Sequence, residues 1–501
     1  MSEQHVYSTD EKFDVIRSRV GLLLGPAFAL FIYFVPLPGL SEPAHVLASV
    51  LSLVIIWWIS ECIPIPATSL LGLALCSVTG VAAPRKVFSA FADPVIFLFI
   101  GSFILAQAMS RHGLDSRLAY SILSVRWVSA RPFTIVIAFG LLSAFLSMWI
   151  SNTATVAMLI PISLGVMQTI SKVSEKPIDL KNSRFASALV LAAAFGASIG
   201  GIATPVGSPP NLIGLGLINE VLGVRVSFFQ WMQFALPMSL FMLIVLFVIL
   251  AAFSPSEVKS TRGVSAYLKE NHKSLARFSR AEINVLIAFS LTVILWVLPG
   301  FLSAIFTKDH ALVLWFEQHI PESVAALIGA SLLFILPVNF REREFTTDWV
   351  QASQIDWGTI MLFGSGLAFG ALMFQTGLAE SVGKGLLHAA GAQSSWSITL
   401  IAIALAVTIT SFASNTASAN MVIPVVISLA KAANIDPVPP AMGACLGASF
   451  GFLLPVSTPP NALAYASGLV PITRLIKLGF LLSIAGIFVL FAGMYLLPLK
   501  H

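Results

Sequence analysis

Two short segments of this 501-residue sequence place Ser, Asn and Thr side by side within long apolar stretches. The first reads SNTA at residues 151–154, and the second reads SNTA at residues 414–417. Side-chain oxygens of these residue types accept hydrogen bonds from the unpaired N–H groups at the start of a helix. Oxygen atoms are also the ligands that hard cations prefer. Each segment therefore predicts a helix start in an apolar region, together with atoms that could bind an ion.

A second pair of polar segments has the same character. VGSPPN occupies residues 206–211, and VSTPPN occupies residues 456–461. Ser or Thr followed by Pro is typical of a helix N-cap with proline in the first helical turn. Together with the SNT segments, the sequence predicts four helix N-termini, each with about half a positive elementary charge and free N–H donors. If these N-termini converge, they favour an anion with carboxylate-like or sulfate-like oxygens.

These four segments contain no Lys or Arg. Burying a dianion in a medium of low dielectric constant requires compensating positive charge, and helix ends supply only part of it. Na⁺ could supply the remainder, as it does at the broken helices of secondary transporters. The candidate ligands are the side chains of Ser147, Asn152, Thr410 and Asn415, with backbone carbonyls near Gly207 and Ser457. The sequence therefore predicts two cation sites beside one anion site.

The composition places these segments in a membrane. The chain is 57% hydrophobic and 10% charged, whereas a soluble globular chain is ~25% charged. Uncharged stretches recur between residues 19 and 498, and many are long enough to span about 30 Å of hydrocarbon. We therefore expect an all-α polytopic membrane protein surrounded by lipid. The net charge of +5 follows the loops, which does not indicate nucleic-acid binding.

The SNT segments belong to an internal repeat. When residue 151 is aligned with residue 414, an offset of 263 residues, Asp93 falls on Asp356 and Pro161 on Pro424. A shared register over such a length is a repeat signal. Each copy holds five crossings and one hairpin, and the odd number of crossings predicts that the second copy is inserted upside down. Inverted repeats with broken helices are typical of secondary transporters, which bind substrate at the repeat interface near the middle of the membrane.

The predicted organisation has about eleven transmembrane helices. Its parts are a cytoplasmic N-terminal segment (1–18), a first transmembrane helix and loop (19–44), a first repeat (45–252) with a hairpin at 132–171 and a broken helix at 186–222, a solvated cytoplasmic linker (253–282), and a second repeat (283–501) with a hairpin at 396–430 and a broken helix at 440–468. Asp93 and Asp356 are expected to cap the helices that follow them.

The orientation follows from the Lys- and Arg-rich segments 111–131, 172–184 and 259–280, which indicate the cytoplasmic side. The N-terminus is therefore expected in the cytoplasm and the C-terminus on the outer face. The stretch 132–171 lies between two cytoplasmic loops, so it either crosses twice with its turn in outside water or forms a re-entrant hairpin. A re-entrant turn is allowed only where protein or a wet cavity surrounds the backbone. The repeat favours re-entrant hairpins, because two of them that enter from opposite faces can meet.

With both SNT hairpins and both SPPN/TPPN breaks, the sequence resembles the divalent anion:Na⁺ symporter (DASS) family along nearly the whole chain. The resemblance implies a homodimer in the cytoplasmic (inner) membrane, with an immobile scaffold and a moving transport domain in each protomer. It also implies elevator-type, sodium-coupled transport of succinate, malate, fumarate, citrate or sulfate.

The resemblance further implies roles for individual residues. The substrate-binding residues would be Ser151, Asn152, Thr153, Ser208, Pro209, Ser414, Asn415, Thr416, Thr458 and Pro459. The first sodium site would comprise Ser147, Ser151, Asn152 and the Gly207 carbonyl, and the second would comprise Thr410, the Ala413 carbonyl, Asn415 and the Ser457 carbonyl. The hydroxyls of Ser147 and Thr410 favour sodium coupling.

Other functions stay open at this level. Relatives of the same family include sodium-independent dicarboxylate exchangers and sulfate transporters, and an anion channel is a different possibility. A membrane hydrolase could use Ser151 or Ser414 as its nucleophile, but the sequence places no His or Asp beside them at membrane depth. A cation/proton antiporter usually needs a buried acid, which these breaks lack. We therefore expect a transporter of small dianions and not an enzyme.

Overall fold

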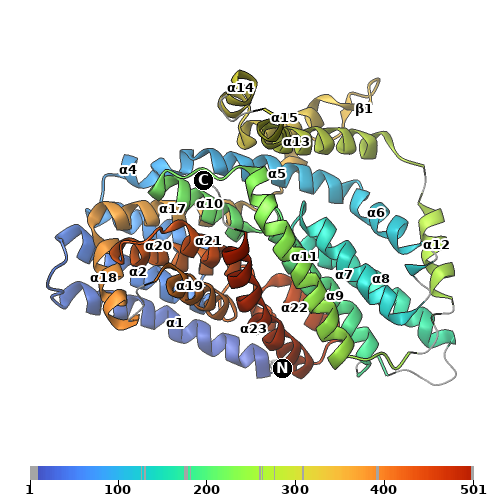
Figure 1. Ribbon diagram of the computed structural model, residues 1–501, viewed down its shortest axis with the longest axis horizontal. Helices are drawn as coiled ribbons and strands as arrows, with labels where there is room; N and C mark the ends of the chain where they lie inside the picture. Colours follow the sequence, from blue (N-terminus) through green and yellow to red (C-terminus); the bar gives the residue numbers. More distant parts are fainter. Residues whose placement is uncertain are drawn as a thin grey trace, which may run out of the picture.

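The computed structural model describes residues 9–125, 127–128, 131–173, 179–180, 182–258, 261, 263–275, 277–306, 310–390 and 394–497. Among these residues the only strands form a two-stranded antiparallel hairpin of β1 (Pro337–Asn339) and β2 (Glu344–Phe345). The rest of the secondary structure is helical, as the sequence predicts. Figure 1 shows α13, α14 and α15 together with this hairpin along one edge of the helical body.

The first half of the chain follows the predicted order of elements. It contains α1 (Thr9–Phe34), α2 (Glu42–Ser60), α3 (Ile65–Val78), α4 (Pro84–Phe88), the 3-10 helix η1 (Ser89–Ala92), α5 (Pro94–Arg111), α6 (Leu114–Leu123), α7 (Pro132–Ser147), α8 (Asn152–Val173), α9 (Arg184–Gly201), α10 (Pro209–Leu222) and α11 (Phe228–Phe253). The SNT segment separates α7 from α8, and the SPPN segment starts α10, so both are helix starts as expected.

The second half is also a series of helices interrupted at its SNT and TPPN segments. It contains α12 (Val264–Ser274), α13 (Arg280–Ile305), α14 (Ala311–His319), α15 (Glu322–Ile335), α16 (Trp349–Ala352), α17 (Trp357–Thr376), α18 (Leu378–Ala390), α19 (Ser395–Thr410), α20 (Asn415–Ala432), α21 (Val438–Gly447), the 3-10 helix η3 (Pro455–Ser457), α22 (Pro459–Ala466) and α23 (Ile472–Leu496). Again an SNT segment separates two helices, α19 and α20, and the TPPN segment starts a third, α22.

Nine helices of the described chain are long and apolar enough to cross a membrane, or ten if the bent pair α14–α15 counts as one span. The nine include α8, which was predicted as a hairpin arm and not as a crossing, so eight of the eleven predicted crossings are among them. The other three predicted spans are shorter or more broken than their hydropathy suggests. Helices α3 and α15 have 14 residues each, which is about 21 Å at 1.5 Å per residue. The second broken helix consists of α21, with 10 residues, and α22, with 8.

Helix caps confirm the predicted roles of two aspartates. The Asp93 carboxylate accepts a hydrogen bond from the Val95 N–H at 2.8 Å, and the Asp356 carboxylate accepts one from the Thr359 N–H at 3.0 Å. Each side chain satisfies an N–H group that would otherwise lack a partner at the start of α5 or α17. Because the two aspartates are matched in the repeat, the same device starts the same helix in both halves.

The segment 253–282 differs from the solvated linker that the sequence predicts. It contains α12, in which Val264 and Leu268 are fully buried. The ring of Tyr267 lies against Gly165 of α8, and α12 also contacts α6. The physical reason is the four-residue spacing of Val264 and Leu268, which places both on one face of a helix. This short apolar face is easily overlooked among the basic residues that surround it.

Packing brings the two halves together crosswise. Hairpin arm α8 contacts α22, which restarts the second broken helix, and hairpin arm α20 contacts α10, which restarts the first. Within each half, the other hairpin arm packs against the first part of the broken helix, α7 on α9 and α19 on α21. Each hairpin is therefore held between a broken helix of its own half and one of the other half.

Candidate functional site

The first hairpin turns between Ser147, the last residue of α7, and Asn152, the first residue of α8. The Ser151 hydroxyl oxygen accepts a hydrogen bond from the Ala154 N–H at 3.2 Å, so Ser151 caps α8 as predicted. The Ser147 hydroxyl, which is fully buried, is hydrogen-bonded to the Asn152 side-chain amide. Residues five apart in sequence thus meet, because the tight turn brings the end of one helix beside the start of the next.

The Asn152 side chain faces a cluster of oxygen atoms. One terminal atom of the Asn152 amide lies 3.1 Å from the Gly207 carbonyl oxygen and 3.3 Å from the Ala197 carbonyl oxygen. The same atom also contacts the Ser147 hydroxyl. The amide can meet these oxygens in two ways: its NH₂ group can donate to them, or its oxygen can share a cation with them. Three of the four residues predicted for the first sodium site, Ser147, Asn152 and Gly207, therefore converge. Their oxygens are of the type that binds a hard cation.

Gly201, at the end of α9, is a residue that the sequence analysis missed. A Cβ atom at this position would lie 2.6 Å from the Asn152 side-chain oxygen and 3.0 Å from the Gly207 carbonyl oxygen. Only a residue without a side chain leaves room for the oxygen cluster. The available signal in the sequence was the pair Gly200–Gly201 shortly before the SPPN segment.

The second hairpin repeats this arrangement between α19 and α20. The Ser414 hydroxyl oxygen accepts from the Ala417 N–H at 3.2 Å, so Ser414 caps α20. The buried Thr410 hydroxyl lies 2.7 Å from the Asn415 side-chain oxygen and 2.8 Å from the Ala448 carbonyl oxygen. Thr410 and Asn415, both predicted for the second sodium site, are thus in contact.

Gly451 takes the place of Gly201 in the second site. A Cβ atom at Gly451 would lie 2.9 Å from the Asn415 side-chain oxygen and 2.9 Å from the Thr410 carbonyl oxygen. The side chain of buried Ser457 turns to the Leu454 carbonyl. The carbonyls of Ala413 and Ser457 stay predicted ligands, because the described contacts do not join them to Asn415.

A pair of asparagines holds the two unwound loops. The Asn211 side-chain N–H groups donate to the carbonyls of Gly201 and Thr204, both at 2.8 Å. The Asn461 side-chain N–H groups donate to the carbonyls of Gly451 and Leu454 at 2.9 and 3.1 Å. Both asparagines are fully buried. The last residue of each SPPN/TPPN segment therefore fixes the loop that precedes it, a role that the sequence analysis did not assign.

The helix starts at the SPPN and TPPN segments offer fewer donors than predicted. Their first two helical residues are prolines, which have no N–H. The next N–H groups, of Asn211 and Asn461, donate to the carbonyls of Ser208 and Thr458 at 3.1 and 3.0 Å. These two N-termini keep their positive dipole ends but not the free N–H donors that we expected.

The hairpin tips retain donors. Among the hydrogen bonds of the described residues, none uses the N–H groups of Asn152, Thr153, Asn415 or Thr416. Ser151 and Thr153 are exposed, and Ser414, Asn415 and Thr416 are partly exposed. The tips therefore suit an anion, whereas the carbonyl-rich breaks suit a cation.

The hydroxyls of the two breaks are used differently. The Thr458 hydroxyl oxygen accepts from the Asn461 N–H at 3.4 Å and caps α22, as predicted. Ser208 makes no side-chain cap for α10, so its predicted capping role is wrong. Its hydroxyl instead lies 3.0 Å from the Ser449 hydroxyl, and both side chains are buried. Pro209 is partly exposed and Pro459 is exposed, so of these predicted substrate contacts only the prolines lie at a surface.

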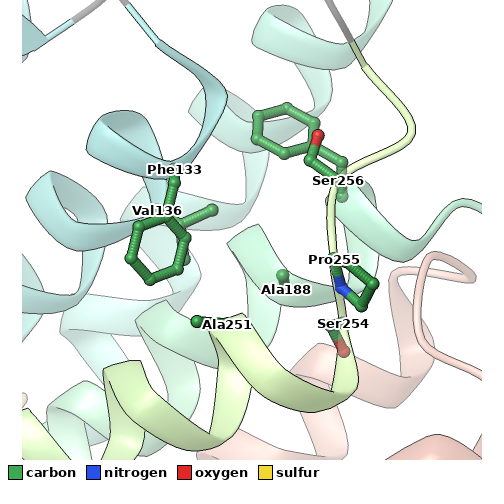
Figure 2. Close-up of a pocket in the computed structure, with 8 residues that line it drawn as sticks. Phe133, Val136, Ala188, Ala251, Ser254, Pro255 and Ser256 are labelled. Atoms are coloured by element: carbon green, nitrogen blue, oxygen red, sulfur yellow. The ribbon is translucent and has the colours of Figure 1, made fainter.

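None of the hydrogen bonds and ion pairs described for these site residues involves a charged side chain. The described residues contain no group of three or more His, Cys, Asp or Glu side chains that could hold a metal ion. A cavity of about 220 Å³ lies elsewhere, between the start of α7 and the end of α11. Figure 2 shows Phe133 and Val136 on one side of this cavity and Ser254, Pro255 and Ser256 on the other. None of the predicted site residues lines it.

Two solved structures share the fold of this chain. The chain resembles the Alcanivorax borkumensis YdaH transporter with a TM-score of 0.57 and 16% identity, over 96% of this chain and 98% of that one. It resembles Neisseria gonorrhoeae MtrF, described as belonging to a class of antimetabolite efflux pumps, with a TM-score of 0.53 and 14% identity, over 99% of this chain and 96% of that one. These likenesses show that the chain shares the fold of both proteins.

Sequence comparisons then give the family. The family model described as the sodium:sulfate symporter transmembrane region matches residues 17–499. The chain is 32% identical over 485 residues to the sodium-dependent dicarboxylate transporter SdcS of Staphylococcus saprophyticus, covering 95% of this chain and 91% of the relative. It is also 32% identical over 488 residues to SdcS of Staphylococcus aureus strain RF122, covering 96% and 91%. The chain therefore belongs to the divalent anion:Na⁺ symporter family, and the relatives named above are transporters.

Proposed function

We propose that this protein is a sodium-coupled symporter of di- or tricarboxylates, such as succinate, malate and fumarate, in the cytoplasmic membrane. The observation that carries the proposal is the oxygen cluster in which Asn152, Gly207 and Ala197 face one another. Such a cluster is suited to Na⁺. The relatives named as sodium-dependent dicarboxylate transporters support the same substrate and ion.

Sodium would bind before the anion. The first ion would use Ser147, Ser151, Asn152 and the Gly207 carbonyl, and the second would use Thr410, Asn415 and the carbonyls of Ala413 and Ser457. Two bound cations add positive charge beside hairpin tips that already carry positive dipole ends. A dianion then finds compensating charge without any Lys or Arg, which is the requirement that its burial imposes.

The anion would bind at the hairpin tips. The free N–H groups of Asn152, Thr153, Asn415 and Thr416 lie next to the hydroxyls of Ser151 and Ser414, so each tip can offer several donors to one carboxylate. Hydrogen bonds to an ionised group are stronger than neutral ones. If each hairpin tip binds one carboxylate, a dicarboxylate can use both tips and should bind more tightly than a monocarboxylate.

The repeat and the motion belong to the same proposal. The matched hydrogen bonds of Asn211 and Asn461 support an internal repeat, and the charge distribution along the sequence supports its inversion across the membrane. We propose that the protein is a homodimer with its N-terminus in the cytoplasm and its C-terminus outside, and that each protomer works as an elevator. Buried loops between crosswise-packed helices suit the movement of an intact domain.

Uptake by purified protein in proteoliposomes tests the proposal. An inward sodium gradient should drive accumulation of labelled succinate, and replacing external Na⁺ with K⁺ should abolish it. Accumulation without sodium but dependent on internal dicarboxylate would instead identify an exchanger. Preference for labelled sulfate, which the family description suggests, would change the substrate. Conductance without coupling to the sodium gradient would identify a channel and overturn the proposal.

A further inference from the structure

Two buried hydroxyls join the broken helices: Ser208, which the family resemblance assigns to the substrate site, and Ser449, to which no role has been given so far. Ser208 precedes α10 in the first break, and Ser449 follows α21 in the second. Their hydroxyl oxygens lie 3.0 Å apart, and both side chains are buried. The residues are 241 positions apart in the chain, so the hydrogen bond between them joins one half of the protein to the other.

Each of these serines is bonded covalently to a residue of one cation site. Ser208 follows Gly207, whose carbonyl lies 3.1 Å from the Asn152 amide in the first site. Ser449 follows Ala448, whose carbonyl accepts from the Thr410 hydroxyl at 2.8 Å in the second. Thr410 in turn contacts Asn415 at 2.7 Å. A continuous path therefore runs from Asn152 to Asn415, and the Ser208–Ser449 pair is its only step between the two halves.

Among the described residues, the Cys445 thiol also joins the two broken helices. It lies 3.1 Å from the Pro210 carbonyl oxygen, also buried, with a second, longer contact of 3.8 Å to the Asn211 carbonyl oxygen. It joins α21 to α10 away from the carbonyls of Gly207 and Ala448. A thiol is a weak donor, so the hydroxyl pair is the stronger and better placed connection.

We propose that the Ser208–Ser449 pair couples the two cation sites, so that sodium bound at one raises the affinity of the other. This inference rests on the proposed sodium-coupled function. A cation that draws in the Gly207 carbonyl fixes the peptide group between Gly207 and Ser208, and hence the position of the Ser208 hydroxyl. That hydroxyl orders Ser449 and the preceding Ala448 carbonyl, to which Thr410 is bonded. Ordering one site in advance lowers the entropy cost of filling the other.

The coupling is reciprocal, as linkage requires. Sodium at the second site engages the Thr410 hydroxyl oxygen and directs its proton to the Ala448 carbonyl, which holds Ser449 against Ser208. Coupling free energies between sites typically correspond to about 5- to 150-fold in affinity. Sodium binding should therefore be cooperative, and the pair is a positioning device because neither hydroxyl needs to touch an ion.

The experiment is a sodium titration of the purified full-length protein without substrate, followed by tryptophan fluorescence, since Trp149 lies in the first hairpin turn. We expect a Hill coefficient well above unity for the wild type. Ser449→Ala should bring it close to unity and raise the half-saturating sodium concentration about fivefold or more. Ser163→Ala is the matched control, because the Ser163 hydroxyl is also fully buried but bonds only to Leu159 of its own helix, at 2.9 Å.

A double variant separates coupling from stability. Ser449→Ala leaves the Ser208 hydroxyl buried without its partner, whereas removing both hydroxyls can be nearly neutral for folding. Ser208→Ala/Ser449→Ala should therefore regain the melting temperature of the wild type while its sodium titration stays non-cooperative. Recovery of cooperativity together with stability would reduce the pair to a structural contact and overturn the inference. If Ser449→Ala does not fold, the double variant decides the matter alone.

The other outcomes are distinguishable. A non-cooperative wild-type titration, or a Ser449→Ala variant with the wild-type Hill coefficient, would overturn the coupling while leaving sodium-driven uptake intact. Absence of any sodium dependence in wild-type uptake would overturn the proposed function itself.

Discussion

The two hairpin tips differ in what their asparagine side chains meet. At the first tip, Asn152 faces the carbonyls of Gly207 and Ala197 at 3.1 and 3.3 Å. At the second, Asn415 meets the Thr410 hydroxyl, which is also bonded to the Ala448 carbonyl. Neutral hydrogen bonds can therefore hold either site, but the Asn152 amide has three oxygen neighbours, whereas the described hydrogen bonds join the Asn415 side-chain oxygen to the Thr410 hydroxyl alone.

The difference indicates that the two matched cation sites respond to sodium to different extents. A cation is attracted by every oxygen that converges on it, so the site with more converging oxygens gains more from binding an ion. We therefore expect sodium binding to stabilise the first site more than the second. Variants of matched residues test this comparison.

The largest effect is expected from the two asparagines. Asn152→Ala removes a ligand of the cation itself, and losing an interaction with a charged group costs about 3 kcal/mol, or roughly 100-fold. Sodium-driven succinate uptake in proteoliposomes should fall by about that factor, and by a smaller factor, roughly tenfold or more, in Asn415→Ala. Asn284→Ala is the control, since Asn284 bonds Thr346 outside the site. Undiminished uptake in both site variants would refute the cation sites.

The two glycines sharpen the comparison. Gly201→Ala brings a methyl group to 2.6 Å from the Asn152 oxygen, and Gly451→Ala brings one to 2.9 Å from the Asn415 oxygen. Overpacking costs about 1–3 kcal/mol, so the half-saturating sodium concentration for uptake should rise about tenfold in Gly201→Ala and less in Gly451→Ala. Gly385→Ala, where a Cβ meets nothing within 4 Å, should leave it unchanged. A larger effect at Gly451 would reverse the ranking of the sites.

The loop asparagines should behave alike, because their hydrogen bonds match. Asn211→Ala and Asn461→Ala each remove two buried hydrogen bonds that hold a loop, at a cost of about 1–3 kcal/mol per site. Both variants should lower the melting temperature of the purified protein by similar amounts. A drop in one and none in the other would show that the two loops are not equivalent supports.

The smallest effect concerns the caps. Thr458→Ala removes the side-chain cap of α22 and should cost about 1 kcal/mol, seen as a slightly lower melting temperature. Thr458→Ser keeps the hydroxyl and should retain most of that stability. Equal melting temperatures of the Ala and Ser variants would mean that the 3.4 Å contact contributes nothing.

Much of this arrangement could be predicted from the sequence because it depends on local patterns. SNT and SPPN segments carry their cap residues and prolines within a few positions, and the resulting helix starts are found where expected. The convergence of Ser147 with Asn152 and of Thr410 with Asn415 also follows from short spacing. The two SNT segments and the SPPN/TPPN pair also indicated the internal repeat, which relates the first site to the second.

Other features depend on packing that no local pattern encodes. Ser449 meets Ser208 from 241 residues away, and its own sequence surroundings are merely small and apolar. Gly201 and Gly451 matter because of what stands opposite their missing side chains. The lack of free N–H donors at the starts of α10 and α22 could have been predicted, since proline has no N–H. The prediction of anion binding at these starts considered only the positive end of the helix dipole.

The paired prolines at 209–210 and 459–460 have one more consequence. Proline disfavours helical backbone in the residue before it, and Ser208 and Thr458 are accordingly extended, with φ near −143° and −147°. Neither α10 nor α22 can extend at its N-terminus into the preceding loop, so helix growth cannot close either break. Any large motion of this protein must therefore move the unwound loops without refolding them. The helix breaks then persist in every conformation of the protein.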